Sequence, residues 1–191
     1  MRIADLGNIR CGNQVTDTYF ALKTVVARLL EQHITPLIIG GSQDLTYANY
    51  QAYESLGQII NMASVDSGFD IGVHREEPLG HKNFLSTILT HKPNYLFNYT
   101  HIGYQTYFVD QDAIELMDKL YFDAYRLGEV RAKMEEVEPI VRNADLLSFD
   151  ISSIRQSDAP GNANASPNGF YGEEACQIVR YAGLSDKLSS I

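Results

Sequence analysis

The sequence has no tryptophan, only two cysteines and no long apolar run. Cys11 and Cys176 stand far apart and match no zinc or redox spacing, so we expect two reduced thiols. No apolar stretch approaches the roughly 20 residues that a membrane-spanning helix needs. Residues 1–7 also lack the apolar segment of a signal peptide. Together these absences predict a soluble, cytoplasmic protein with no membrane partner.

Concentrated positive charge is absent as well. The 15 Lys and Arg residues are scattered among 24 Asp and Glu residues, which gives a formal net charge of −9 at pH 7. Binding to nucleic acid needs a positive face, so we expect no nucleic-acid partner. The content of 45% hydrophobic and 20% charged residues is typical of a globular protein, and 191 residues are enough for one domain with a substantial core.

Apolar periodicity predicts alternating helices and strands. We expect helices over residues 17–32, 44–54, 83–91, 113–119, 129–143 and 173–182. Thr16 is the expected N-cap of the first helix, and Pro139 is expected to interrupt the fifth. We expect buried strands over residues 37–39, 58–65, 95–102 and 145–149. The alternation predicts an α/β fold of three α/β/α layers with a mainly parallel sheet, followed after residue 150 by a long loop over residues 151–172.

Three polar segments directly follow predicted strands. They are Gly-Gly-Ser-Gln-Asp at residues 40–44, Val-Asp-Ser-Gly-Phe-Asp at 65–70 and Ser-Phe-Asp-Ile-Ser at 148–152. Ligands of open α/β sheets bind outside the carboxyl ends of the strands. We therefore expect Asp66, Asp70 and Asp150 to converge in one crevice, where three carboxylates favour a cation. Histidines that would complete a transition-metal site are absent from these segments.

The order of these segments resembles the ureohydrolase superfamily, which includes arginase, agmatinase and formimidoylglutamase. The family pattern reads Gly-Gly-Asp-His, Asp-Ala-His-x-Asp and Ser-Phe-Asp-x-Asp, followed by a loop with Ala-Pro-Gly, which stands here at residues 159–161. The formimidoylglutamase branch is the closest likeness, and the resemblance covers about residues 34–182. It implies an arginase-like fold. Such enzymes are longer, so residues 1–191 are expected to be a single domain from a longer chain.

In that family, two Mn²⁺ ions share a bridging hydroxide that attacks a guanidinium or formimidoyl carbon. Carried over position by position, the resemblance implies one metal site formed by four side chains: Gln43, Asp66, Asp70 and Asp150. The second site would lose both of its unshared ligands, because Gly68 and Ser152 replace them. We therefore expect no two-metal Mn²⁺ site, whereas one divalent cation (Mn²⁺, Mg²⁺ or Ca²⁺) is compatible with the oxygen ligands.

Two functions follow from this resemblance. The first is a formimidoylglutamase/arginase-family protein with a degraded metal site, inactive or strongly impaired in C–N hydrolysis. It would bind a small guanidino or amino-acid-like ligand, or act through contacts in a homo-oligomer. The alternative is hydrolysis of a linear amidine or guanidino C–N bond, of the formimidoylglutamate, agmatine or arginine type, with one metal. His81 is the candidate catalytic residue, because relatives place substrate-contacting residues in its segment.

Simpler interpretations stay open for these residues. Each aspartate is compatible with a helix cap or a loop carboxylate, Gln43 with the first turn of a helix, and His81 with an exposed loop. Ser42 lies in a segment close to the Gly-x-Ser-x-Gly elbow of serine hydrolases. Asp66 or Asp70, followed by His81 or His101, would complete that order. His101, among several aromatic residues, is expected to be a packing residue.

Overall fold

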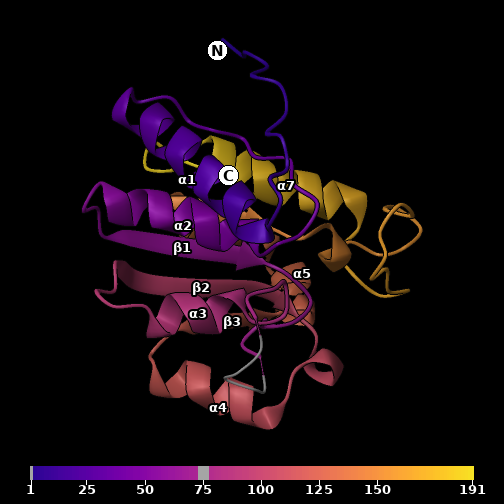
Figure 1. The fold of residues 1–191 in the computed structure, drawn as a ribbon. Coiled ribbons are helices and arrows are strands. Elements are labelled where there is room, and N and C mark those ends of the chain that lie inside the picture. The colour runs from indigo at the N-terminus through magenta and orange to yellow at the C-terminus, as the bar shows by residue number, and fades with distance from the viewer. Residues whose placement is uncertain (1, 73–77) are drawn as a thin grey trace.

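A four-stranded parallel sheet lies between two layers of helices (Figure 1). The computed structural model describes residues 2–72 and 78–191. In that part of the chain the predicted three-layer α/β/α fold is confirmed, with the strand order β3-β2-β1-β4 and three parallel pairings. The strands are β1 (Ile60–Val65), β2 (Leu96–Tyr104), β3 (Asp123–Arg126) and β4 (Leu146–Phe149).

The two helical layers bury separate hydrophobic cores against the two faces of the sheet. Successive strand residues face opposite sides, so Met62 belongs to one core and Ala63 to the other. Four helices cover the first face: α1 (Val15–Glu31), α2 (Leu45–Ser55), α3 (Phe84–Thr90) and α4 (Gln111–Lys119). Three cover the second: α5 (Leu127–Ala132), α6 (Val137–Arg142) and α7 (Gly172–Gly183).

A cap at Thr16 would start the first helix at residue 17, but α1 begins two residues earlier, at Val15. Its N-cap is Gln14, whose backbone N–H donates to Asp17 Oδ2 at 3.0 Å. The predicted Thr16 cap is therefore wrong, because the Asp17 carboxylate satisfies a free amide from inside the first turn. The helix buries the stripe Tyr19, Leu22, Val26 and Leu30, as the helical spacing predicts.

The predicted strand over residues 37–39 is not formed. This segment is extended and pairs with the last residue of the chain: Ile38 N–H donates to Ile191 O at 2.8 Å, and Ile191 N–H donates to Pro36 O at 3.1 Å. Leu37 and Ile39 are 68% and 92% exposed. Ile38, between them, is partly buried against the first core. An apolar run forms a buried strand only where neighbouring chain covers both faces, and here only one face is covered.

The helix predicted over residues 129–143 is divided, but not at Pro139. Lys133 leaves helical geometry with φ −145° and ψ 59°, and a short 3₁₀ turn at Met134–Glu136 leads into α6. Pro139 lies in the first turn of α6, where its missing N–H removes no intrahelical hydrogen bond.

Strand β3 was not predicted from the sequence. Two of its four residues are exposed and two are partly buried, and they show no apolar alternation.

The long loop before α7 is tied to the sheet by Phe170. Phe170 N–H donates to Ser153 O at 2.8 Å, Ile154 and Phe170 form a β-bridge, and the Phe170 ring is fully buried in the second core. Gly103, near the end of β2, has φ +96°, and a Cβ there would lie 2.3 Å from a Phe170 ring carbon. Phe170 thus anchors the loop against the carboxyl-terminal part of β2.

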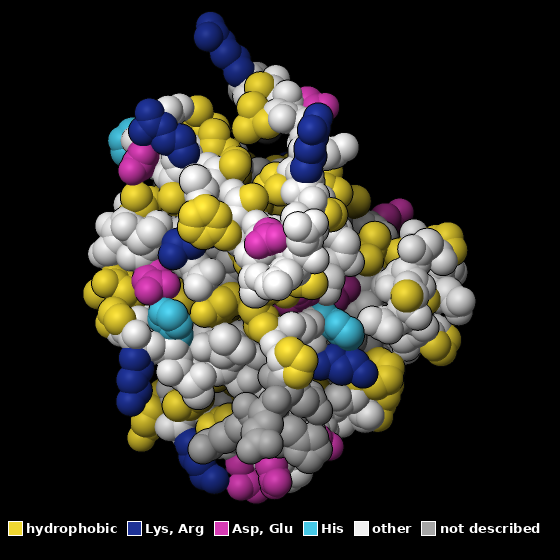
Figure 2. All heavy atoms as spheres, in the orientation of Figure 1, with side chains coloured by type: hydrophobic (Ala, Val, Ile, Leu, Met, Phe, Trp, Pro, Cys, Tyr) yellow, Lys and Arg dark blue, Asp and Glu magenta, His cyan; other side chains and the backbone are white. Residues whose placement is uncertain are grey.

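The surface shows no gathering of positive charge on the face drawn in Figure 2, where Lys and Arg side chains are scattered. Cys11 and Cys176 are exposed free thiols, as predicted. Among the helices that the structure describes, none is both long and apolar enough to cross a membrane.

Gly103→Ala should destabilise the protein by about 2–4 kcal/mol, because the left-handed backbone costs about 1–2 kcal/mol and the overpacking about 1–3 kcal/mol. Urea denaturation of the variant measures the loss. Gly183→Ala, at the end of α7 with nothing within 4 Å of its added Cβ, is the control and should change stability by less than about 1 kcal/mol. Equal unfolding midpoints for wild type and Gly103→Ala would contradict the proposed anchor.

Candidate functional site

Three aspartates lie together at the carboxyl ends of β1 and β4. Asp66 directly follows β1 and is 4% exposed, and Asp150 directly follows β4. The ends of these strands are neighbours, since Val65 and Phe149 are paired in register. Asp70 closes the turn after β1 with φ +48°, a left-handed conformation that aspartate tolerates better than most residues. The sequence thus predicts correctly where these carboxylates meet.

The side-chain amide of Gln43 lies at the centre of these carboxylates. In the orientation that satisfies both of its ends, its nitrogen donates to Asp66 Oδ2 at 2.9 Å, Asp70 Oδ2 at 2.9 Å and Asp150 Oδ2 at 3.1 Å. Its oxygen accepts from Ser148 Oγ at 3.2 Å. An amide nitrogen carries only two protons, so three acceptors share two N–H groups. The nitrogen therefore takes the central position that a cation would need.

These distances are typical of hydrogen bonds rather than of metal ligation. Oxygen ligands lie about 2.0–2.6 Å from Mg²⁺ or Ca²⁺, well inside the observed separations from the central nitrogen. No group of three or more His, Cys, Asp or Glu side chains is arranged to hold a metal ion in residues 2–72 and 78–191. A cation would have to displace the Gln43 nitrogen and draw the carboxylates inward. The assignment of Gln43 as a metal ligand stays a prediction.

Gly68 and Ser152, where the family pattern has further ligands, support Asp66 and Asp150 by hydrogen bonding. Ser152 Oγ donates to Asp66 Oδ1 at 3.3 Å, and Ser152 N–H donates to Asp150 Oδ1 at 2.7 Å. A Cβ at Gly68 would meet only Phe108 O, at 3.8 Å, so the position has room for a side chain. Neither residue offers an imidazole or a carboxylate, the groups that a second metal would require.

Burial and like charge raise the pKa values of Asp66 and Asp70. Burial, together with the charge of Asp66 and a hydrogen bond shared with it, raises the pKa of Asp70 to about 10, and Lys82 opposes this shift. Burial also raises the pKa of Asp66. Two carboxyl groups in contact cannot both ionise at low cost, so a proton between them relieves the repulsion. The crevice is thereby stabilised by the Gln43 amide and a shared proton.

His101 lies behind Asp66 and has both ring nitrogens engaged. Nδ1 contacts Tyr99 Oη at 2.9 Å, and Nε2 donates to the backbone oxygen of Asp66 at 3.1 Å. Burial lowers the pKa of His101 to about 4, so it is a neutral packing residue, as expected. No hydrogen bond in the described part of the chain connects His101 or the exposed His81 to Ser42. The serine-hydrolase alternative therefore has no geometric support here.

Two hydroxyl-bearing residues of the site were not predicted from the sequence. Ser148 Oγ hydrogen-bonds to Thr46 Oγ1 at 2.8 Å and also reaches the Gln43 amide. Strand alternation is the signal that would have found Ser148, because residues two apart share a face and Asp150 is two positions on. Thr46 has no such signal, since it lies in the first turn of α2.

The fold and this pattern match one family. The Arginase family matches residues 1–190 of the sequence. The chain belongs to the arginase family. It is 26% identical to a formimidoylglutamase of Staphylococcus haemolyticus (strain JCSC1435), over 99% of this chain and 63% of that protein. It is 24% identical to a formimidoylglutamase of Geobacillus kaustophilus (strain HTA426), over 93% and 58% of the two chains.

Solved structures show the same fold. Trypanosoma cruzi formiminoglutamase with Mn²⁺ superposes with a TM-score of 0.86 at 19% identity, over 94% of this chain and 63% of that one. Formimidoylglutamase from Bacillus subtilis gives a TM-score of 0.84 at 19% identity, over 98% and 62%. The arginase-like fold is therefore confirmed. This chain spans 58% and 63% of the length of the two curated relatives it matches above.

Asp70→Asn should stabilise the metal-free protein at high pH. Because the pKa of Asp70 is raised from 3.8 to about 10 in the folded state, its contribution to stability is lost as pH rises between those values. Asparagine cannot ionise, so the variant should exceed wild type by at least about 1.4 kcal/mol at about pH 9, the equivalent of one pKa unit, and match it near pH 4.

Urea unfolding in the presence of a chelator, repeated across this pH range, measures the difference. The exposed Asp186, changed to Asn, is the matched control and should keep the pH profile of wild type. A variant Asp70→Asn that is no more stable than wild type at the high-pH end would show that the carboxylates do not repel one another.

Proposed function

We propose that this arginase-family protein is inactive or strongly impaired as a C–N hydrolase, because the Gln43 amide closes its carboxylate crevice. The observation that carries the proposal is the position of the Gln43 nitrogen, 2.9–3.1 Å from oxygens of Asp66, Asp70 and Asp150. The three carboxylates are already satisfied by an amide and a shared proton. A cation would have to displace this amide before it could reach the carboxylates.

Hydrolysis in the manner of the family needs an activated water. A bound metal supplies it by lowering the pKa of water from 15.7 to about 7, and two metals clamp the attacking oxygen. Gly68 and Ser152 leave the second metal without its own ligands. No other base replaces the metal among the residues described at the site, because the neutral His101 has both nitrogens engaged. The described residues of the site therefore supply no nucleophile of sufficient strength near neutral pH.

The crevice is suited instead to a small ligand with a cationic nitrogen. A guanidinium, amidinium or ammonium group can present several N–H donors to the carboxylates that now receive the Gln43 amide. Such a ligand would displace the amide and take up the charge that the shared proton now neutralises. A guanidino or amino-acid-like molecule in the cytoplasm fits this description. Contacts in a homo-oligomer would be compatible with it.

The second candidate function is single-metal hydrolysis of a linear amidine or guanidino C–N bond. The convergence of three Asp Oδ2 atoms on one point favours it, because rotation of Gln43 would leave a carboxylate cage for Mn²⁺, Mg²⁺ or Ca²⁺. A similar protein, Trypanosoma cruzi formiminoglutamase, has been solved with Mn²⁺. His81 would then be the candidate acid–base residue.

Calorimetric titration of the metal-stripped chain with Mn²⁺, together with turnover assays on formimidoylglutamate, agmatine and arginine, separates the two functions. We expect no tight Mn²⁺ site, no turnover with Mn²⁺ in excess, and a rise in melting temperature with agmatine or arginine that needs no metal. One tight site that is lost in Asp66→Asn and Asp150→Asn, with turnover abolished by chelator, would establish the single-metal enzyme. Two tight sites would overturn both.

Gln43→Glu should turn the crevice into a cation site. The change removes the central N–H donors and adds a fourth carboxylate, so the variant should bind Mn²⁺ at least about tenfold more tightly than wild type and be about 2 kcal/mol less stable in chelator. Calorimetry and urea unfolding measure the two effects. Gln58→Glu, at an exposed position, is the control and should change neither. Unchanged Mn²⁺ affinity in Gln43→Glu would contradict the role given to the amide.

A further inference from the structure

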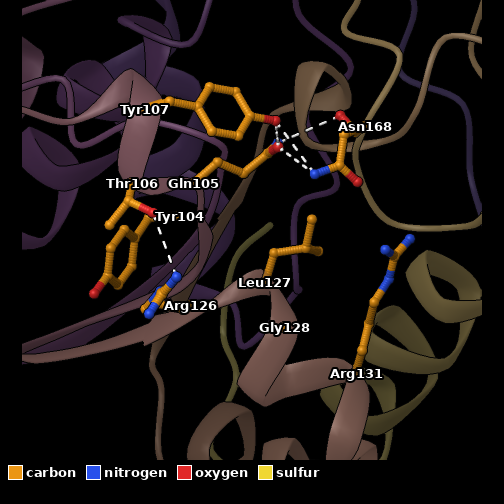
Figure 3. Close-up of a pocket in the computed structure, with 9 residues that line it drawn as sticks. All are labelled: Tyr104, Gln105, Thr106, Tyr107, Arg126, Leu127, Gly128, Arg131 and Asn168. Carbon is orange, nitrogen blue, oxygen red and sulfur yellow. Dashed lines mark hydrogen bonds between the residues drawn. The ribbon is translucent and has the colours of Figure 1, made fainter.

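A second pocket, of about 160 Å³, opens between the loop after β2 and the loop before α7 (Figure 3). Its polar lining comes from seven side chains: Tyr104, Gln105, Thr106, Tyr107, Arg126, Arg131 and Asn168. No Asp or Glu is among the described residues that line it, although the protein carries a net charge of −9. The pocket is therefore rich in hydrogen-bond donors and positive in charge, the opposite of the aspartate crevice.

Arg131 is a fixed wall of this pocket. Its Nε donates to Glu174 Oε2 at 3.0 Å, and its Nη2 donates to Gly169 O. Its guanidinium also lies 4.3 Å from the centre of the Tyr171 ring. These contacts use two of its N–H donors and pair its charge with Glu174, so Arg131 shapes the pocket and leaves recognition to another residue.

Arg126 is the lining residue whose charge is not paired with a described acidic group. Its side chain is exposed, and within the described part of the chain that side chain makes one hydrogen bond, a long one from Nη2 to Thr106 Oγ1 at 3.4 Å. It forms no ion pair with an acidic group of residues 2–72 or 78–191. A guanidinium has five N–H donors, so most of those on Arg126 are open to a ligand. Planar guanidinium binds a carboxylate through two parallel hydrogen bonds.

The opposite wall is a preformed network of polar side chains. Asn168 Nδ2 donates to Gln105 Oε1 at 3.0 Å and to Tyr107 Oη at 3.2 Å, as Figure 3 shows. The backbone N–H of Gln105 donates to Ser67 O at 2.9 Å, next to Asp66. This hydrogen bond joins the lining of the pocket to the turn that carries Asp66.

The spacing of the two sites follows from the sheet. Arg126 ends β3, and β3 is two strands from β1, whose end carries Asp66. At about 4.8 Å between neighbouring strands, the two backbones lie about 10 Å apart. A small molecule held by side chains from both strands can bridge this distance.

We propose that this pocket is a carboxylate-binding site and that Arg126 is the residue that holds the carboxylate. The guanidinium binds the two oxygens, while Thr106 and the Gln105–Tyr107–Asn168 network complete the lining. A carboxylate fits better than a larger anion, because the pocket is small and Arg126 offers a planar pair of donors. Resting on the proposed function, one dipolar ligand bridges both sites, with its cationic nitrogen in the crevice and its carboxylate at Arg126.

Calorimetry with three probes at constant ionic strength tests this assignment: glutarate, guanidine and inorganic phosphate. We expect glutarate to bind wild type and to lose at least about tenfold in affinity in Arg126→Met, a change equivalent to about 1.4 kcal/mol. Arg126→Lys should restore part of the affinity. Arg180→Met removes an exposed arginine from α7 and should leave glutarate binding unchanged. Guanidine binding should depend on Asp66 and be indifferent to Arg126.

The outcomes distinguish this inference from the proposed function. Equal glutarate affinity in wild type and Arg126→Met, or no glutarate binding to wild type, overturns the carboxylate site whatever guanidine does. Phosphate that binds as tightly as glutarate at Arg126 overturns the assignment to a carboxylate. Loss of guanidine binding alone, with glutarate still dependent on Arg126, refutes the proposed crevice ligand and leaves the carboxylate site standing.

Discussion

The hydrogen bonds from the Gln43 amide to three carboxylates are the interaction on which this end of the molecule depends. They join the segment before α2, the turn after β1 and the end of β4 at one point. Without a donor at that point, Asp66, Asp70 and Asp150 would place like charges close together and destabilise the fold. Burial already raises the pKa values of Asp66 and Asp70. An amide can take the place of a cation there because it supplies N–H groups without needing ligands of its own.

The polar ends of the strands divide into two regions of opposite charge. The aspartate crevice lies at the ends of β1 and β4, and the arginine pocket lies beside β2 and β3. Gln105 belongs to the pocket and is hydrogen-bonded to the turn that carries Asp66. The proposed ligand, a small molecule with a positive and a negative end, would match this division.

The sequence predicted the layers of the fold and the meeting of the aspartates well, because both follow from apolar periodicity and from the geometry of parallel strands. Predictions from the sequence were wrong or incomplete where tertiary contacts determine the local structure. The run around Leu37 is apolar but covered on one face only, and β3 forms through backbone pairing although its residues carry no strand pattern. The orientation of the Gln43 amide was beyond the sequence too, since it depends on acceptors that lie far apart along the chain. Arg126 showed no signal at all, because one exposed arginine resembles any other.

The most direct test of this account is a crystal structure of the full chain grown with excess Mn²⁺, with anomalous diffraction recorded at the manganese absorption edge. The account predicts no anomalous peak between the three aspartates and a Gln43 amide nitrogen within hydrogen-bonding distance of all of them. An anomalous peak at that point, with the carboxylate oxygens drawn in to metal-ligand distances and the amide rotated away, would contradict it.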